Sequence, residues 1–387
     1  MANFLVLGAG KMGIVLAKDL IESNLRNRVT LVDKNPEQLR YGKEFIQSKR
    51  LVALERDVED KKQREETFKG QDVALCALLH KHSLPVLGTA IEKGVHFVDL
   101  VGENPLARLE HDDEAKKKGI TIISGVGLSP GITNICVRRA LRLLDETEKA
   151  LIYVGGNPVR PKPPLSYRIV YATDSLLNFY ERKVPILKEG KEVEVEPLSG
   201  IEPIAFPPDF PEMECFYTDG LNSLFYTMRG KVKRELAQKT VRHKGHAEGI
   251  KTLKECGFFS AKPIKVGNQE VVPRKVLEKL LDSRMKLGEE KDVTLMRIIV
   301  SGEKKGKPET HLFEMIDYYD SEKKYTSMAK TTSFSASIAS QMIASGQIQK
   351  RGSLFPENIF DNELFLPFVQ ELKKRAVKIT YKIVQNK

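Results

Sequence analysis

The first 145 residues alternate regularly between short apolar, β-branched runs and longer helical patterns. Regular alternation of this kind indicates βαβ units arranged around a parallel sheet. We therefore expect an α/β fold that begins with a Rossmann-type domain of six strands. The predicted strand and helix pairs are 3–8 with 11–24, 28–33 with 36–47, 51–57 with 59–69, 72–78 with 83–94, 96–101 with 104–118, and 120–125 with 130–145.

Beyond residue 148 the pattern changes to strand-like segments with fewer helices between them. One of these segments predicts a hairpin that turns at Glu189-Gly190, because a glycine there accommodates a tight turn. This part of the chain is typical of a second, α+β domain with a mixed or antiparallel sheet. Its predicted strands are 149–156, 165–172, the two arms of the hairpin within 184–197, and an antiparallel pair, 292–301 with 309–319.

We place the Rossmann-type domain at 1–128 and the α+β domain at 129–330. A helix rich in small residues is predicted at 331–346, followed by a helix near 362–375 and a strand-like run at 377–384. We expect residues 331–387 to return and complete the first domain.

Composition excludes several classes of protein. The 387 residues carry 63 Lys and Arg against 52 Asp and Glu, a net charge of +11, but the basic runs are short and lack interleaved aromatics, which argues against nucleic-acid binding. No apolar stretch approaches the roughly 20 residues that a membrane span requires. The N-terminus has no signal-peptide pattern, and the four cysteines form no CxxC pair. We expect a cytoplasmic protein without a membrane anchor.

The strongest local motif is VLGAGKMG at 6–13, a GxGxxG turn between the first strand and the first helix. Gly8 allows the tight turn, Gly10 lets a diphosphate approach the backbone, and Gly13 lets the helix pack on the strand. Lys11 and Met12 stand at the helix N-terminus, whose free N–H groups favour an anion. The motif predicts a dinucleotide site.

Asp33 ends the second strand, 20 residues after Gly13, where a carboxylate accepts hydrogen bonds from the adenosine ribose. A 2′-phosphate would meet its negative charge, so NAD is favoured over NADP, although the neighbouring Lys34 offsets part of that charge.

Ligands of such sheets bind at the carboxyl ends of the strands, which adds further cofactor candidates. His80 and His82 also follow the fourth strand, but no third ligand with metal-site spacing accompanies them, so we expect no metal. The further cofactor candidates are Asp57, Ala77, Leu78, Asp99 and Gly127.

A second glycine-bearing turn, GVGLSPGITN at 125–134, precedes the sixth predicted helix. Ser129 suits a helix cap, Pro130 the first helical turn, and Gly131 a close approach to the backbone. Free N–H groups there are expected to hold a carboxylate or the nicotinamide carboxamide. An ordinary helix start remains the alternative.

The stretch VRHKGHAEG at 241–249 offers a second set of polar groups. Arg242 supplies a fork that matches a carboxylate, and His246 a group that ordinarily titrates near neutral pH. A basic surface loop is the alternative interpretation.

Several of these motifs together resemble the saccharopine dehydrogenase-like family, over nearly the whole chain. The branch that contains lysine 6-dehydrogenase is the most similar. The motifs are GAGKMG, GVGLSPGITN, YVGGNPVRPKPPLSYRI (153–169), YTDGLNS (217–223), RHKGH (242–246) and SMAKTTSFSASIAS (327–340).

The resemblance implies oxidation of a CH–NH2 or CH–NH group with a nicotinamide cofactor, and a homodimer. Our lead hypothesis is NAD-dependent oxidative deamination of L-lysine to 2-aminoadipate 6-semialdehyde. Arg242, with Gly131 and Tyr167, is expected to bind the amino-acid substrate. His246 is the first candidate for proton transfer and Asp219 the second, because an unperturbed His is partly protonated near neutral pH.

Three alternatives stay open at this point. A saccharopine reductase would bind three carboxylates and so need more cations, for which Arg234 or Lys233 are available. A related imine reductase would share the fold, cofactor and hydride step. A non-catalytic NAD(H)-binding regulator would bind cofactor without turnover.

Overall fold

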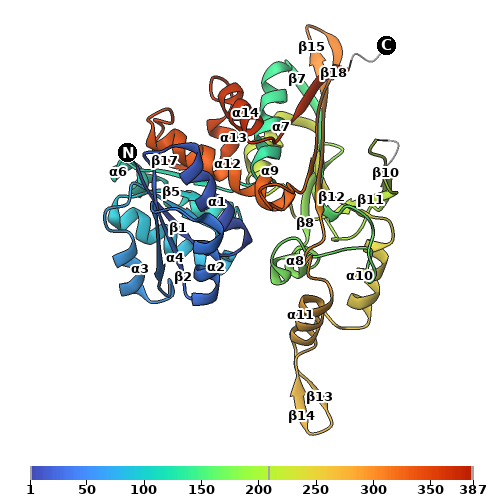
Figure 1. Ribbon diagram of the computed structural model, residues 1–387. Coiled ribbons are helices and arrows are strands. Elements are labelled where there is room, and N and C mark those ends of the chain that lie inside the picture. Colours follow the sequence, from blue (N-terminus) through green and yellow to red (C-terminus); the bar gives the residue numbers. More distant parts are fainter. Residues whose placement is uncertain (1, 208–209, 385–387) are drawn as a thin grey trace. The chain divides into compact units, whose positions relative to one another are not determined.

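The computed structural model describes residues 2–207 and 210–384, which form two compact units (Figure 1). The first unit comprises the chain up to Leu143, together with Asn222–Met228 and Ala329–Ile379. The second comprises Leu144–Leu221, Arg229–Met328 and the chain from Thr380. None of the helices within the described ranges is both long and apolar enough to cross a membrane.

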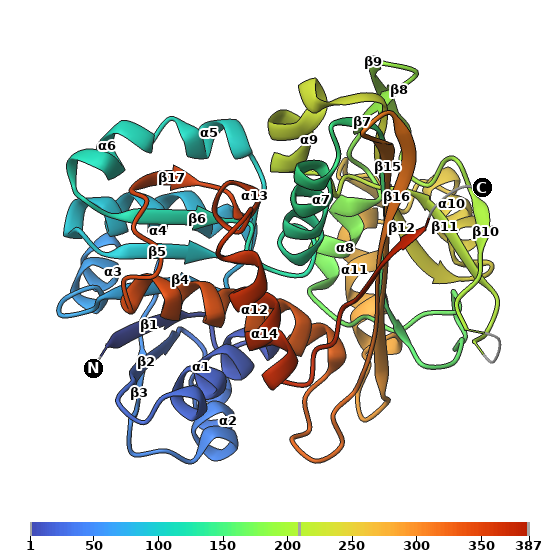
Figure 2. The ribbon, with the colours of Figure 1, turned by 90° about the horizontal axis from the view of Figure 1, so that it is seen from above.

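The first unit is built on a seven-stranded parallel sheet of order β17-β6-β5-β4-β1-β2-β3 (Figure 2). Helices cover parallel strands on both faces, which is why the central strands read as continuous apolar runs. Six strands follow the 3-2-1-4-5-6 order of dinucleotide-binding folds, so the α/β prediction is confirmed. The strands are β1 (Asn3–Leu7), β2 (Arg28–Asp33), β3 (Leu51–Glu55), β4 (Val73–Cys76), β5 (His96–Asp99), β6 (Thr121–Ser124) and β17 (Gly352–Leu354).

The helices of the first unit pack on this sheet, for example α1 on β1 and β2, and α4 on β4 and β5. The single helix expected at 104–118 is two short helices, α5 and α6, separated at Glu110-His111. The helices are α1 (Lys11–Ser23), α2 (Pro36–Ile46), α3 (Lys61–Thr67), α4 (His80–Lys93), α5 (Pro105–Leu109), α6 (Asp112–Lys117), α7 (Ile132–Leu143), α9 (Ser223–Met228), α12 (Ser327–Ala344, from Ala329 on), α13 (Pro356–Ile359) and α14 (Phe365–Lys374).

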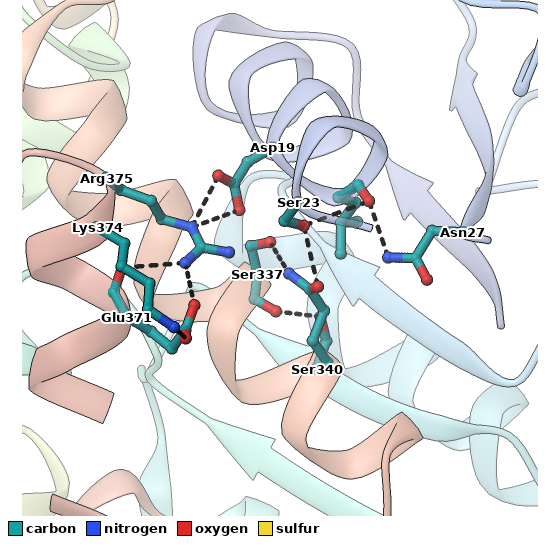
Figure 3. Close-up of polar contacts among 10 residues, drawn as sticks. Asp19, Ser23, Asn27, Ser337, Ser340, Glu371, Lys374 and Arg375 are labelled. Atoms are coloured by element: carbon teal, nitrogen blue, oxygen red, sulfur yellow. Dashed lines mark hydrogen bonds and ion pairs between the residues drawn. The ribbon is translucent and has the colours of Figure 1, made fainter. Parts of the chain in front are cut away.

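Polar contacts join the late helices to α1 (Figure 3). The Nε atom of Arg375, just after α14, lies 2.8 and 3.0 Å from the two carboxylate oxygens of Asp19 on α1. Ser23, at the end of α1, donates to the side-chain oxygen of Gln341 on α12 at 2.9 Å. Asp19 is largely buried, so this ion pair is partly removed from water. The pair holds the end of α14 against α1 in the first unit.

The second unit is built on a nine-stranded mixed sheet with the main order β10-β11-β12-β7-β15-β16-β18. Only β12 and β7 run parallel, and every other described pair is antiparallel. Both expected hairpins are confirmed: β8 and β9 turn at Glu189-Gly190, and β15 and β16 at Lys305-Gly306. The strands are β7 (Glu146–Pro158), β8 (Val184–Lys188), β9 (Lys191–Val195), β10 (Glu202–Ile204), β11 (Met213–Tyr217), β12 (Val232–His243), β15 (Asp292–Lys304), β16 (Lys307–Tyr318) and β18 (Thr380–Val384).

Three α-helices pack beside this sheet around an apolar cluster that includes Tyr167, Leu177, Phe216, Ile250 and Leu281. This cluster is the core that supports the polar groups described below. The helices are α8 (Thr173–Phe179), α10 (His246–Glu255) and α11 (Pro273–Arg284), with a 3-10 turn at Arg229–Lys231 and a small hairpin of β13 (Ile264–Val266) and β14 (Gln269–Val271).

The strand expected at 165–172 is absent from the described structure, where only an isolated bridge joins Ile169 to Lys286. Leu165 and Ser166 both have positive φ, so the chain turns there instead of extending. The apolar residues of this segment point into the core cluster and produced the misleading strand pattern.

The units differ from the expected ranges in three places. Helix α7 and the short segment Asn222–Met228 belong to the first unit, although we expected 129–330 to be separate from it. The last strand, β18, pairs with β16 in the second unit instead of returning to the first. These assignments depend on strand pairing and packing between segments that are far apart in the chain. Local sequence patterns do not predict such contacts.

Candidate functional site

The glycine turn at the start of α1 has the geometry that a diphosphate requires. Gly8 has a φ of +102°, and an added Cβ there would lie 2.8 Å from the carbonyl oxygen of Ala77. At Gly13 an added Cβ would lie 1.8 Å from the Gly8 carbonyl oxygen. Gly10, in contrast, has nothing within 4 Å of an added Cβ, and no side chain caps α1. The backbone at Gly10 is therefore open to a ligand, while Gly8 and Gly13 make the turn compact.

Asp33 is tied to this turn at the end of β2. One carboxylate oxygen accepts from the Ala9 N–H at 2.7 Å, and the other accepts from the Asn35 N–H at 2.8 Å. These bonds hold the half-buried carboxylate beside the glycine turn, with lone pairs left over for ribose hydroxyls. Lys34 reaches away, to Asp57 at 3.8 Å and Glu59 at 4.0 Å.

The chain following β4 also meets the turn. A Cβ on Gly8 would lie 3.2 Å from the Leu78 side chain, so Ala77 and Leu78 line the same place as the glycines. Lys11 is exposed at the start of α1, and the Met12 carbonyl accepts a hydrogen bond from Ser333 at 2.8 Å. These residues fit a dinucleotide site, because an open backbone, an uncapped helix N-terminus and an acceptor lie together.

Asp99 differs from the prediction that it contacts the cofactor. It is fully buried, and Arg108 lies 2.7 Å from one of its carboxylate oxygens while the Val101 N–H donates to the other. Arg108 also donates to Ser83 and Ser124. Both oxygens of Asp99 are thus engaged inside the first unit. Burial raises the pKa of Asp99, although the Arg108 charge opposes that shift.

The second turn, at 125–134, does not offer the free N–H groups that we expected. The Gly127 N–H donates to Pro130, the Ile132 N–H to Gly127 and the Thr133 N–H to Leu128, so the turn is closed on itself. Gly131 is buried with a φ of +131°, and an added Cβ would lie 2.0 Å from the Gly127 oxygen. Helix α7 begins at Ile132, after Pro130. Gly127 and Gly131 therefore make this turn compact, and the substrate contact of Gly131 stays a prediction.

A second cluster of polar groups lies in the second unit around Arg242, near the end of β12. Arg242 is 2% exposed, and its Cζ lies 4.6 Å from the centre of the Tyr167 ring. Its guanidinium donates to the Val241 carbonyl at 2.9 Å and interacts with the hydroxyls of Tyr171 and Tyr180. Burial opposes its charge, but the three tyrosines raise the pKa of Arg242 above its ordinary value, so it stays a cation.

Arg242 carries hydrogen-bonding capacity that the protein does not use. Within residues 2–207 and 210–384 no carboxylate forms an ion pair with it, and its Nε is buried without a hydrogen-bond partner. Gly155 makes room for the guanidinium, because a Cβ there would lie 2.8 Å from its Nη1 atom. A buried guanidinium without an anion is costly, which marks this cluster as a candidate anion site.

His246, which begins α10, was expected to titrate near neutral pH, and the structure contradicts this. The side chain is fully buried, with Nδ1 2.8 Å from the Leu165 carbonyl oxygen and Nε2 2.8 Å from the Tyr180 hydroxyl. Burial, reinforced by the Arg242 charge, lowers the pKa of His246 to about 3. The imidazole is neutral at physiological pH, and both ring nitrogens are engaged.

Sequence reasoning missed Glu214 on β11. This buried carboxylate accepts from the Gly245 N–H at 3.0 Å and from the Ala247 N–H at 2.7 Å, and so caps the N-terminus of α10. Acidic residues are favoured at helix N-termini, but this one is 31 residues away in the chain. A local sequence pattern cannot predict a helix cap from a residue so far away in the chain.

Asp219 lies in the loop after β11, half-buried, with Arg182 3.8 Å from its carboxylate. The structure brings together Arg242, His246 and Tyr167, and no described contact joins Asp219 to them. Across the described ranges, no three His, Cys, Asp or Glu side chains gather in a way that would hold a metal ion.

A surface hollow of about 310 Å3 lies in the first unit near the end of α1. Its walls include Ser23 and Gln341, which belong to the contacts of Figure 3. Ser23 lies 12 residues along α1 from Lys11, which corresponds to about 18 Å of helix. The hollow is therefore separate from the glycine turn.

Two family models match the chain. The saccharopine dehydrogenase NADP binding domain matches residues 4–123, and the saccharopine dehydrogenase C-terminal domain matches residues 127–377. The second match alone covers more than half of the chain.

Full-length relatives agree with these matches. The chain is 22% identical to a saccharopine dehydrogenase [NADP(+), L-glutamate-forming] of Schizosaccharomyces pombe, with 100% of each covered. It is also 22% identical to a carboxyaminopropylagmatine dehydrogenase of Synechocystis, with 96% of each covered.

Among solved structures, the apo L-Glu-forming saccharopine dehydrogenase of Saccharomyces cerevisiae is similar with a TM-score of 0.82 at 20% identity. The similarity covers 99% of this chain and 100% of that one. At this identity the likeness supports the fold, and the family rests on the two domain matches. The chain therefore belongs to the saccharopine dehydrogenase family and is a saccharopine dehydrogenase-like, NAD(P)-dependent oxidoreductase.

Proposed function

We propose that the protein is an NAD-dependent L-lysine 6-dehydrogenase, which converts lysine, water and NAD to 2-aminoadipate 6-semialdehyde, ammonia and NADH with release of a proton. The observation that carries this proposal is the buried, anion-free guanidinium of Arg242. The α-carboxylate of an amino acid supplies the missing anion in a shape that a guanidinium fork matches.

A substrate with a single carboxylate is favoured by the distribution of charge along β12. The cations that we considered for additional carboxylates, Arg234 and Lys233, lie eight and nine residues from Arg242, which is about 26–30 Å of extended chain. Lys233 also pairs with Glu146. Neither can share one small substrate with Arg242, so lysine suits this cluster better than a tricarboxylate does.

NAD is favoured over NADP by the fixed position of Asp33. Its hydrogen bonds to Ala9 and Asn35 hold a negative charge where the ribose is expected, and a 2′-phosphate would be repelled. The S. pombe relative is named as an NADP enzyme, which makes Asp33 the first residue to test. When bound, the nicotinamide cofactor supplies the acceptor for the two electrons that leave the amine.

Different residues would bind the cofactor, orient the substrate and accept a proton. Gly10 and the N-terminus of α1 hold the diphosphate, Asp33 holds the ribose, and Arg242 orients the substrate through its carboxylate. Asp219 is the remaining candidate for accepting a proton, because His246 is already committed to its two hydrogen bonds.

Reduction of an imine to saccharopine is the second candidate, because full-length relatives carry that name. Reduction of a polyamine-type imine is a third, on the name of the Synechocystis relative. Both would use the same fold and cofactor, and both differ from the first proposal in substrate charge.

A substrate panel separates these candidates. The protein is mixed with NAD or NADP and, in turn, with lysine, saccharopine, ornithine or carboxynorspermidine, and the absorbance of reduced cofactor is followed. We expect turnover with lysine and NAD, and loss of most of it in Arg242→Met. Turnover with saccharopine alone would overturn the lysine assignment. Cofactor binding without turnover of any amine would favour a regulator.

A further inference from the structure

The hydrogen bonds around His246 fix which nitrogen carries the proton. A carbonyl oxygen only accepts, so the Nδ1 atom, 2.8 Å from the Leu165 oxygen, carries the hydrogen. The ring is neutral, and its Nε2 atom is then an acceptor. Tyr180, whose hydroxyl lies 2.8 Å from Nε2, must therefore donate its proton to His246.

This direction determines what Tyr180 offers to Arg242. Because the Tyr180 proton points at His246, the Tyr180 oxygen can only accept further hydrogen bonds. The Arg242 guanidinium carries only N–H donors, so it can only donate to that oxygen. The two groups interact. Hydrogen bonds with one direction thus run from Tyr180 through His246 to the Leu165 carbonyl, and the Arg242 guanidinium interacts with the Tyr180 oxygen at their start.

Packing holds these hydrogen-bonded groups in place. The His246 ring stacks on Phe216 with centroids 6.3 Å apart and meets the edge of Tyr167 at 4.9 Å. Tyr167, Tyr180 and Phe216 are all fully buried, so no water competes for the bonds. A protonated imidazole would place a second positive charge next to Arg242 and would remove the acceptor that Tyr180 uses.

We propose that His246 is a positioning residue that, through Tyr180, sets the direction of the Arg242 guanidinium toward the carboxylate of the substrate. The inference rests on the proposed role of Arg242 and deepens it. His246 contributes a neutral acceptor and takes no part in moving a proton to or from the reacting amine.

The test compares an amino acid with its decarboxylated counterpart in the full-length enzyme with cofactor. Tyr180→Phe and His246→Phe remove the hydroxyl and the acceptor while keeping an aromatic ring, and His246→Gln retains an acceptor. KM for lysine and the inhibition constant of 1,5-diaminopentane are measured for each.

We expect KM for lysine to rise about tenfold or more in both Phe variants and to recover partly in His246→Gln. The inhibition constant of the diamine should stay within about threefold of wild type, since the diamine has no carboxylate. The pH profile of kcat should keep its shape in all three variants. Thermal melting confirms that each variant folds.

Arg242→Met separates the two proposals. If it leaves the affinity for lysine unchanged, the carboxylate role of Arg242 is wrong and the proposed function loses its support. If it weakens lysine binding while the Tyr180 and His246 variants do not, only the positioning proposal is overturned. Loss of a titrating limb from the pH profile of the His246 variants, or equal weakening of lysine and the diamine, would also overturn it.

Discussion

Glu214 and Arg242 occupy paired positions on β11 and β12, yet the Glu214 carboxylate bonds to the N–H groups of Gly245 and Ala247 and forms no ion pair with Arg242. The N-terminus of α10 carries partial positive charge and competes successfully for the carboxylate. Glu214 is thus engaged by α10, and the Arg242 guanidinium remains without an ion-pair partner.

Glu214→Gln should lower the free energy of unfolding by about 1–3 kcal/mol, because the amide retains one acceptor oxygen and turns a donor toward an N–H group. Urea unfolding measures the difference. Glu212→Gln is the matched control, since Glu212 is exposed and pairs with the exposed Lys244, and it should lower the free energy of unfolding much less than Glu214→Gln does. Equal effects of the two substitutions would show that the cap does not stabilise α10.

Gly10→Ala should weaken cofactor binding at least about tenfold, or about 1.4 kcal/mol, while leaving the melting temperature nearly unchanged. Gly10 has an ordinary φ of −75° and open space at its Cα, so only a bound diphosphate would meet the new methyl group. Titration calorimetry with the dinucleotide gives the affinity. Gly88→Ala, which also has nothing within 4 Å, should leave the affinity unaltered. If Gly10→Ala binds cofactor like wild type, the turn does not hold the diphosphate.

Asp33→Asn should shift the ratio of affinities for NAD and NADP toward NADP by about tenfold. The amide oxygen can still accept from Ala9, but the negative charge that would repel a 2′-phosphate is gone. Dissociation constants of both cofactors, measured for wild type and variant, give the ratio. A wild-type enzyme that already prefers NADP would contradict the role that we give to Asp33.

Glu357→Gln should change how stability depends on pH. Glu357 is fully buried and accepts from Asn134 and Thr227, and burial raises its pKa above the ordinary value of 4.5. The folded state therefore favours the protonated acid, so this stability is present below 4.5 and is lost as pH rises through the raised value. The variant avoids that loss.

The unfolding free energy of Glu357→Gln minus that of wild type should thus increase as pH rises from about 4 to about 8. Urea unfolding at several pH values measures this difference, and the other buried carboxyls cancel from it. Glu363→Gln controls for loss of one negative charge at an exposed position. A difference that stays flat across the range would show that ionisation of Glu357 does not oppose folding.

The sequence predicted the structure best where the residues concerned lie close together along the chain. Gly8, Gly10, Gly13 and Asp33 belong to one βαβ unit, β1-α1-β2, so their spacing predicted the glycine turn and the carboxylate beside it. The alternation of strands and helices predicted the parallel sheet for the same reason, because each βαβ unit is local.

The predictions for Asp99 and His246 failed because both side chains are buried and engaged by other residues of the protein. Asp99 ends a strand as a cofactor ligand would, but Arg108 and Val101 engage it inside the unit. His246 has the ordinary chemistry of histidine only in water, and full burial beside Arg242 removes its charge. The sequence shows which groups exist, but not which of them lose contact with solvent.

The interleaving of the two units has a consequence for biosynthesis. The polypeptide passes from one unit to the other after residues 143, 221, 228, 328 and 379. Strands β1 to β6 leave the ribosome early, but α12, β17 and α14, which complete their unit, emerge only after residue 327. The sheet of the first unit therefore stays incomplete in the nascent chain until Gly352–Leu354 have been synthesised, and β18 is the last described element to take its place beside β16.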